Sequence, residues 1–271
     1  MRREVMFSAL RFLIGECPHF GINAASACST SGDKMATFVL VHGGWRGGWV
    51  WYRVAKQLRE NGHTVYTPTL SGLAERSHLL NMGVNLTTHI QDIVNLIKCE
   101  ELKDVVLCGH SYGGFVISGV ADQIPECISS LVYFDAFVPQ DGDSVFTLSS
   151  EAFQLYAIKT AAQLGGIACV TVPAASFALN EQDRAWFDEK TTPHPLASML
   201  EGVRLKGDHL KVKKRMFIMA IWVTEFPSPF RQFYDRLKDD PAWVIHTVES
   251  GHDVMLNDPQ AFVKFLQEAA G

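Results

Sequence analysis

The sequence predicts an α/β fold in which a mostly parallel, six-stranded sheet is flanked by helices. From residue 36 onward, short β-branched runs alternate with amphipathic stretches, a rhythm typical of parallel strands joined by helices. With 271 residues, of which 47% are hydrophobic, the chain is long enough to bury one large core. A single segment without β-branched runs interrupts the rhythm, so we expect one insertion in an otherwise regular domain.

Strands are expected where β-branched and aromatic residues gather between turn residues. The six expected strands are Thr37–Val41, Thr64–Thr67, Asp104–Cys108, Ile128–Phe134, Met216–Trp222 and Trp243–Val248. Helices are expected in the amphipathic stretches between them, several of which begin with Thr, Ser or Pro in capping positions. The expected helices are Trp49–Glu60, Thr88–Glu100, Tyr112–Asp122, Pro229–Lys238 and Pro259–Ala270.

The regular alternation stops between Pro139 and about Leu210, where aromatic residues lie among helix formers. A plain loop of this length is rare in a compact domain. We therefore predict a helical lid over residues 139–210, inserted after the strand 128–134, and a core made of residues 35–138 and 211–271. A lid over the carboxyl ends of the strands would roof a binding site and line it with aromatic side chains.

The first 34 residues stand apart from this pattern. Arg2-Arg3 and the apolar stretch Met6–Gly15 resemble a secretion signal, and Ala25–Cys28 resembles a cleavage site, but charged residues interrupt the apolar stretch. We interpret residues 1–34 as an extension or leader outside the fold, because Met35 directly precedes the first convincing strand. We expect a cytoplasmic protein, with export as the alternative if these residues are a true leader.

The composition argues against several classes of partner. The formal net charge of -5 and the scattered Lys and Arg residues leave no basic surface for nucleic acid. No uninterrupted apolar run of about 18 residues is present, so a membrane-spanning helix is not expected. The six cysteines form no CxxC pair and have no zinc-like spacing, which favours reduced, packed thiols. The oligomeric state has no signature in the sequence.

The pentapeptide Gly109-His110-Ser111-Tyr112-Gly113 lies between an expected strand and an expected helix. A serine on such a sharp turn adopts strained dihedral angles, and glycines two positions before and after it avoid clashes with the strand and the helix. The turn lifts the Ser111 hydroxyl clear of the sheet, beside the N-terminus of the helix. This context predicts a nucleophile elbow with Ser111 as the nucleophile. An ordinary turn containing Gly and Ser is the alternative.

A serine hydroxyl needs a base to take its proton, and the base needs an acid to hold its tautomer. Among the ten histidines, His252 alone follows the last expected strand and precedes the terminal helix, at the same sheet edge as the elbow. We therefore predict that His252 is the base. The reaction also needs an oxyanion hole, a pair of backbone N–H groups that stabilise the negative charge on the substrate oxygen. The small residues in His42-Gly43-Gly44 can supply one of these groups, so we assign the oxyanion hole to the N–H groups of Gly44 and Tyr112. His42 itself is expected to brace this loop.

Two carboxylates are candidates for the acid, each in a loop after an expected strand. Asp135 ends the strand 128–134 between apolar neighbours, where a carboxylate is costly unless its charge is used. Glu225 follows Trp222 by three positions, where a solvated loop carboxylate is the plainer interpretation. We predict that Asp135 is the acid and keep Glu225 as the alternative.

Three segments resemble the α/β-hydrolase superfamily, and the resemblance extends over residues 36–270. They are Val39–Trp49, with the sequence VLVHGGWRGGW, the elbow Gly109–Gly114 and the segment Gly251–Leu256. Together they are similar to bacterial carboxylesterases of the EstC type, including pyrethroid-hydrolysing esterases, and to plant methyl-ester esterases and hydroxynitrile lyases. The resemblance implies the α/β-hydrolase fold and implies no metal or organic cofactor.

The chain departs from the hydroxynitrile lyases at two positions that those enzymes use on the cyanohydrin. They have a threonine where this chain has Gly43 and a lysine where it has Asp253, so lyase chemistry is disfavoured. The plant esterases take their acid from the loop after the strand that matches Met216–Trp222, where this chain has Val223. Haloalkane dehalogenases have an acid at a position similar to Asp135, although their nucleophile is an aspartate.

The sequence therefore predicts a serine carboxylesterase that acts on a small to medium hydrophobic ester through an acyl-enzyme intermediate. Ser111 attacks the ester carbonyl, and His252 moves the proton. One alternative is a hydrolase-fold ligand receptor or slow-turnover binding protein. Another is a lactonase or an amidase with the same residues, since only the leaving group differs.

Overall fold

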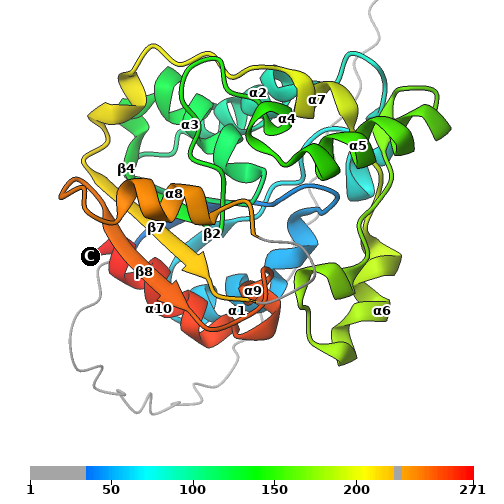
Figure 1. Cartoon of the computed structure of the whole chain (residues 1–271). Helices are drawn as coiled ribbons and strands as arrows, with labels where there is room; N and C mark the ends of the chain where they lie inside the picture. Colours follow the sequence, from blue (N-terminus) through cyan, green and yellow to red (C-terminus); the bar gives the residue numbers. More distant parts are fainter. Residues whose placement is uncertain (1–34, 223–227) are drawn as a thin grey trace, which may run out of the picture. The chain divides into compact units, whose positions relative to one another are not determined.

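The computed structural model describes residues 35–222 and 228–271. It confirms the predicted six-stranded sheet, in which every neighbouring pair of strands is parallel (Figure 1). The strands, in their order across the sheet, are β2 (Thr64–Tyr66), β1 (Thr37–Val41), β3 (Val105–His110), β4 (Ile128–Phe134), β7 (Lys214–Ala220) and β8 (Val244–Val248). The strand β7 begins and ends two residues earlier than expected, so its first two residues are Lys214 and Arg215.

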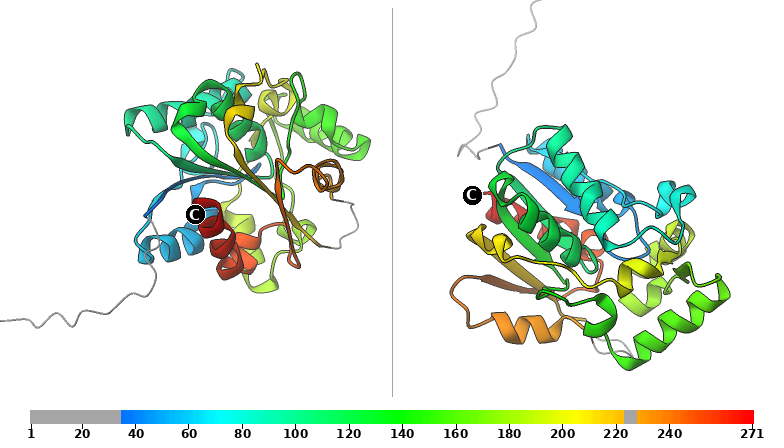
Figure 2. Two further views of the ribbon diagram at one scale, coloured as in Figure 1. Left: turned by 90° about the vertical axis from the view of Figure 1, so that its left-hand side faces the viewer. Right: turned by 90° about the horizontal axis from the view of Figure 1, so that it is seen from above.

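Both faces of the sheet are buried, because successive side chains of a strand point to opposite faces. In β3, Val105 and Leu107 pack into one hydrophobic cluster, while Val106 and Cys108 pack into the other. The first cluster includes α2 (Leu86–Cys99), α3 (Gly113–Gln123) and α8 (Arg231–Leu237), and the second includes α1 (Tyr52–Glu60), α9 (Val254–Asn257) and α10 (Pro259–Ala270). Figure 2 shows these helix layers on either side of the sheet.

The helix α2 begins two residues before its expected start, because Asn85 caps it. The side chain of Asn85 accepts a hydrogen bond from the backbone N–H of Thr88 at 2.9 Å, and the Thr88 hydroxyl accepts from the Asn85 N–H. This reciprocal capping satisfies two of the N–H groups that a helix start leaves without partners. At the other end of the chain, α10 has its expected bounds, with Asp258 as its cap and Pro259 in its first turn.

The segment between β4 and β7 contains four α-helices, two 3₁₀ helices (Ala174–Phe177 and Asp208–Lys211) and a small sheet. The α-helices are α4 (Val145–Leu148), α5 (Glu151–Gln163), α6 (Glu181–Lys190) and α7 (Leu196–Leu200), and the antiparallel strands are β5 (Ala168–Cys169) and β6 (His194–Pro195). The two short strands were not expected from the sequence. Figure 1 shows α5 and α6 on the right, on the side toward which β7 points. That this segment acts as a lid stays a prediction.

The parallel strands bring their following loops to one edge of the sheet. Ser111 follows β3, Asp135 follows β4, Trp222 lies two residues after β7, and His252 lies in the loop after β8. This edge is where ligands bind in open α/β sheets. The alternative acid, Glu225, lies outside the described residues, and so does the expected leader. In the described part of the chain, none of the helices has the length and apolar character needed to span a membrane.

Candidate active site

Ser111 occupies a strained turn between β3 and α3. Its φ angle is 54°, in the left-handed region that non-glycine residues rarely adopt. The Ser111 carbonyl accepts hydrogen bonds from the N–H groups of Gly114 at 3.1 Å and Phe137 at 3.2 Å, which hold the turn in place. The side chain lines a cavity at the carboxyl edge of the sheet. The strand, the strained turn and the helix therefore have the arrangement that the sequence predicted.

The two glycines that flank this turn are required by close backbone approaches. A Cβ atom at Gly109 would lie 2.6 Å from the carbonyl oxygen of Gly113. A Cβ atom at Gly113 would lie 2.8 Å from the carbonyl oxygen of Val41, at the end of β1. Any other residue at either position would force the strand and the helix apart, which confirms the reason given for the glycines of the motif.

His252 and Asp135 form a buried pair beside Ser111. The Nδ1 atom of His252 lies 2.5 Å from Oδ2 of Asp135, and both side chains are buried. His252 lines the same cavity as Ser111. The backbone N–H of His252 donates to the carbonyl of Phe177 at 3.0 Å, and its own carbonyl faces the Nε2 atom of His110 at 3.1 Å. His252 is therefore held at the Nδ1 atom of its ring and at its backbone N–H and carbonyl groups.

The Asp135 carboxylate accepts hydrogen bonds from three N–H groups. Besides His252, the Trp222 indole Nε1 donates to Oδ2 at 3.0 Å and the Ala220 backbone donates to Oδ1 at 3.2 Å. Burial raises the pKa of Asp135 above its usual range, and the bonds from Trp222 and Ala220 oppose that rise. Burial also lowers the pKa of His252 to about 3, so its imidazole is neutral at pH 7.

The loop after β1 carries Gly44, the first predicted oxyanion donor. The carbonyl of Gly43 accepts a hydrogen bond from Nδ1 of His42 at 2.8 Å, while Nε2 of His42 accepts from the Leu70 N–H at 3.1 Å. Because a trans peptide is planar, holding the Gly43 carbonyl also fixes the direction of the Gly44 N–H. Burial lowers the pKa of His42 to about 3, so this neutral tautomer persists at pH 7. His42 braces the loop, as expected.

The next peptide of this loop is held from both ends. The N–H of Trp45 donates to Nδ1 of His194 at 3.2 Å, and the carbonyl of Gly44 accepts from Arg46 at 2.8 Å. Gly44 and Tyr112 both line the cavity. Among the described residues, neither backbone N–H has a hydrogen-bond acceptor. Two backbone amides that lack partners, in residues that line a cavity, are suited to bind a developing oxyanion.

Tyr112, the second predicted donor, is anchored by its side chain. Its hydroxyl donates to Nδ1 of His89 at 2.7 Å, and Nε2 of His89 donates to the carbonyl of Ser71 at 2.9 Å. The Ser71 N–H and hydroxyl both donate to the carboxylate of Asp92. Burial lowers the pKa of His89 to about 4, which keeps this chain of hydrogen bonds in its neutral form at pH 7.

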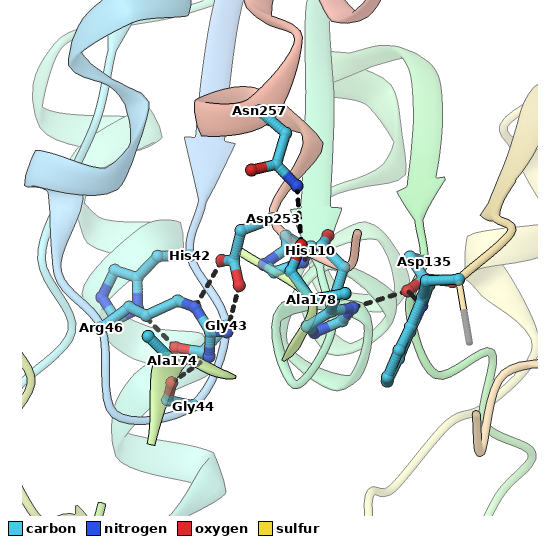
Figure 3. Close-up of polar contacts among 12 residues, drawn as sticks. His42, Gly43, Gly44, Arg46, His110, Asp135, Ala174, Ala178, Asp253 and Asn257 are labelled. Atoms are coloured by element: carbon cyan, nitrogen blue, oxygen red, sulfur yellow. Dashed lines mark hydrogen bonds and ion pairs between the residues drawn. The ribbon is translucent and has the colours of Figure 1, made fainter. Parts of the chain in front are cut away.

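Arg46 and Asp253 form a fully buried ion pair behind the site (Figure 3). Nε of Arg46 donates to Oδ1 of Asp253 at 2.7 Å and one terminal nitrogen donates to Oδ2 at 2.6 Å. The guanidinium also lies over the rings of Phe177 and Phe187, 4.6 Å and 5.1 Å from their centroids. The pair keeps the pKa of Asp253 at about 2, although burial alone would raise it.

A cavity of about 620 Å³ opens beside Ser111 and His252. Among the described residues it has no Asp, Glu, Lys or Arg in its wall. Its aromatic lining residues are Trp45, Tyr112, Phe137, Phe153, Tyr156, Phe177, Trp222 and Phe230. Part of this lining comes from the predicted lid segment, and part from the core. The described wall is therefore mostly apolar, with a few uncharged polar side chains.

A comparison with known protein families agrees with this architecture. The sequence profile described as "Alpha/beta hydrolase family" matches residues 38–265. The chain belongs to this family. The α/β-hydrolase is 42% identical to a carbendazim hydrolyzing esterase of Nocardioides sp. (strain SG-4G), over 86% of this chain and 98% of that protein. It is 26% identical to a putative chloroplastic methylesterase of Arabidopsis thaliana, over 86% of this chain and 71% of the relative.

Solved structures show the same fold. An extracellular alpha/beta-hydrolase from a Paenibacillus species superimposes on the chain with a TM-score of 0.76 and 26% identity, covering 86% of this chain and 98% of that one. A pyrethroid hydrolase from Sphingobium faniae superimposes with a TM-score of 0.67 at 17% identity, covering 88% and 98% of the two chains. At that identity the second likeness supports the fold alone.

Three side chains that organise this α/β-hydrolase site were not found from the sequence. Trp222 bonds the Asp135 carboxylate, His194 bonds the Trp45 N–H, and Arg46 bonds both Asp253 and the Gly44 carbonyl. Arg46 and its partner Asp253 could have been noticed in the sequence, since each is a charged residue inside an otherwise apolar or glycine-rich motif. His194 could not have been, because it lies in the irregular segment between β4 and β7.

Proposed function

We propose that the protein is a serine carboxylic-ester hydrolase, with Ser111 as nucleophile, His252 as base and Asp135 as acid. One observation carries the proposal. Ser111 stands on a strained strand-to-helix turn and lines the same cavity as His252, whose Nδ1 lies 2.5 Å from Asp135. A neutral imidazole held by a buried carboxylate, in the same cavity as a serine hydroxyl, is the arrangement that activates serine.

In the proposed reaction, Ser111 Oγ forms a bond to the ester carbonyl carbon while His252 takes the hydroxyl proton. The negative charge that develops on the carbonyl oxygen is stabilised by the N–H groups of Gly44 and Tyr112. The carbon–oxygen bond to the alcohol then breaks, and His252 returns the proton to the leaving alcohol. A water molecule, deprotonated by His252, attacks the acyl-enzyme and releases the acid and the free serine.

The cavity supports a hydrophobic, uncharged ester of small to medium size as substrate. Burying an ionised group without a partner is costly, and the described wall offers no charged side chain to pair with one. The aromatic residues of the wall favour flat or aromatic groups on the acyl or alcohol side. The names of two relatives, a carbendazim hydrolyzing esterase and a putative methylesterase, support ester hydrolysis and make carbendazim a rational test substrate.

Turnover of a panel of 4-nitrophenyl esters and carbendazim by the purified chain tests the proposal. We expect multiple turnovers by the wild type, and loss of turnover in Ser111→Ala by several orders of magnitude, with folding retained. The exposed Ser77→Ala variant is the matched control and should keep wild-type rates. Substantial activity in Ser111→Ala would refute the serine mechanism. A single burst of product per chain, without further turnover, would favour a receptor instead.

A further inference from the structure

The buried pair of Arg46 and Asp253 joins two loops that carry the proposed chemistry. Arg46 lies two residues after Gly44, and Asp253 directly follows His252. The pair is bidentate, and its side chains are 1% and 0% exposed. Bidentate geometry fixes the relative orientation of the two groups as well as their distance. The pair therefore ties the backbone of the loop after β1 to the backbone of the loop after β8.

Arg46 also acts on the loop that holds the Gly44 amide. Its third donor, Nη1, donates to the Gly44 carbonyl at 2.8 Å, while His194 accepts from the N–H of the same peptide at 3.2 Å. His42 fixes the preceding peptide through the Gly43 carbonyl. With both peptides fixed, the Gly44 N–H is held in one direction, and Gly44 lines the cavity.

The segment around Phe177 contacts the same two loops. The guanidinium of Arg46 lies 4.6 Å from the centre of the Phe177 ring. The Phe177 carbonyl accepts a hydrogen bond from the His252 N–H at 3.0 Å. A Cβ atom at Gly251 would lie 2.2 Å from the Ala178 carbonyl, so this turn packs directly on the histidine loop. Arg46 therefore contacts Phe177, Gly44 and Asp253 at once.

A buried ion pair of this kind is poorly explained by stability alone. The desolvation of two charges offsets much of their attraction, and an apolar pair of similar volume is often equally stable. An apolar pair, however, has no preferred orientation and cannot bond the Gly44 carbonyl. We propose that Arg46 and Asp253 are positioning residues, which hold the Gly44 N–H and the His252 imidazole in register with each other. This inference rests on the ester hydrolysis proposed above.

The double variant Arg46→Met with Asp253→Leu separates positioning from stability. It removes the charges and the three hydrogen bonds together, and leaves no unpaired buried charge. We expect a melting temperature close to that of the wild type and a kcat, per folded chain, lower by about 30-fold or more, since small displacements of catalytic groups are costly. We expect KM for a neutral 4-nitrophenyl ester to stay within about threefold, because neither residue lines the cavity.

The affinity for an inhibitor that mimics the tetrahedral intermediate tests the geometry of the site separately from the stability of the fold. A trifluoromethyl ketone adds to an active serine and places an oxyanion in the hole, so its inhibition constant should rise in parallel with the loss of kcat. An uncharged amide of the same size, which forms no oxyanion, should bind the variant and the wild type equally. A purely structural pair would leave the ratio of these two affinities unchanged.

The pair of Arg53 and Asp183 is the matched control. It is also bidentate, through the two terminal nitrogens of Arg53, at 2.8 and 2.6 Å. It joins α1 to α6, is only partly buried, and neither residue lines the cavity. Arg53→Met with Asp183→Leu should keep the wild-type kcat and the wild-type affinity for the ketone. If the first double variant fails to fold, Arg46→Lys decides, because lysine keeps the charge without the fixed fork. We expect its kcat to be about tenfold below that of the wild type.

The outcomes separate the two proposals. Wild-type kcat and ketone affinity in the folded Arg46 and Asp253 double variant would overturn the positioning role and leave ester hydrolysis intact. If the double variant does not fold, a wild-type kcat in Arg46→Lys would overturn the positioning role and leave ester hydrolysis intact. Equal losses in both double variants would also overturn it, since the effect would not be specific to this pair. If the wild type hydrolyses no ester, or Ser111→Ala keeps its activity, the proposed function fails, and the positioning role fails with it.

Discussion

The Nδ1 atom of His252 lies 2.5 Å from Oδ2 of Asp135, although 117 positions of sequence separate the two residues. The contact exists because β4 and β8 are parallel and both end at the same edge of the sheet, on either side of β7. Trp222, which follows β7, donates to the same carboxylate oxygen. The three loops after β4, β7 and β8 therefore meet at one carboxylate.

The substitution Asp135→Asn tests the proposed acid. An amide cannot stabilise the imidazolium and favours the wrong tautomer of His252, so we expect kcat to fall by about 10³ to 10⁴. The rates of Asp135→Asn and Glu225→Gln should be compared on one 4-nitrophenyl ester, at matched folded fractions. Loss of activity in Glu225→Gln alone would show that the acid was assigned to the wrong residue.

The substitution Gly43→Ala tests the close approach of the first loop to the elbow. The added Cβ would lie 2.9 Å from the Cβ of Ser111 and 3.0 Å from Nδ1 of His110, so one of these groups must move. We expect a loss of about 1 to 3 kcal/mol in the free energy of unfolding and at least a tenfold lower kcat. Gly83→Ala, whose nearest contact is the Asn81 amide oxygen at 3.1 Å, is the control for urea unfolding and kinetics. Wild-type values in Gly43→Ala would contradict the argument.

The buried neutral histidines make stability fall in acid. Burial lowers the pKa of His42 to about 3 and of His89 to about 4, from the ordinary value of 6.5. The unfolded chain therefore binds these protons first, and stability present above pH 6.5 is lost as the pH falls toward 4. For His89 the loss reaches about 3 kcal/mol.

Urea unfolding at several pH values between 7.5 and 4.5 measures this loss. We expect the free energy of unfolding of His89→Asn to change less over this range than that of the wild type. His78→Asn, at an exposed position, is the matched control. Equal pH dependence in His89→Asn and the wild type would rule out His89 as a source of acid lability.

The described residues of the cavity wall carry no charged side chain, which predicts discrimination against anionic esters. A 4-nitrophenyl ester of succinate carries a carboxylate that the wall would bury without a partner, so we expect its kcat/KM to lie about 100-fold or more below that of the neutral pentanoate ester. Gln232→Arg, on the cavity rim, should raise the ratio of succinate to pentanoate rates, and Gln232→Met should not. Comparable rates for the two esters in the wild type would contradict the neutral substrate class.

Most of the fold could be predicted because local patterns in the sequence determine it. β1, β4 and α10 have their expected bounds, since β-branched runs and a capping Asp-Pro pair define their ends. The start of α2 was predicted two residues late, because the cap formed by Asn85 depends on the geometry of the chain before it. The two-residue strands β5 and β6 were missed, since pairs so short carry no periodic signal.

The sequence by itself determined the parallel sheet, the strained serine turn with its two glycines, and the carboxylate that ends β4, because each depends on neighbouring residues. Only the tertiary structure decided which distant side chains meet: Arg46 with Asp253, Trp222 with Asp135, and His194 with the Trp45 N–H. These contacts depend on strand order and on the packing of the segment between β4 and β7. Such contacts leave no periodic pattern in the sequence, because a buried hydrogen bond needs only one donor and one acceptor that the fold brings within about 3 Å.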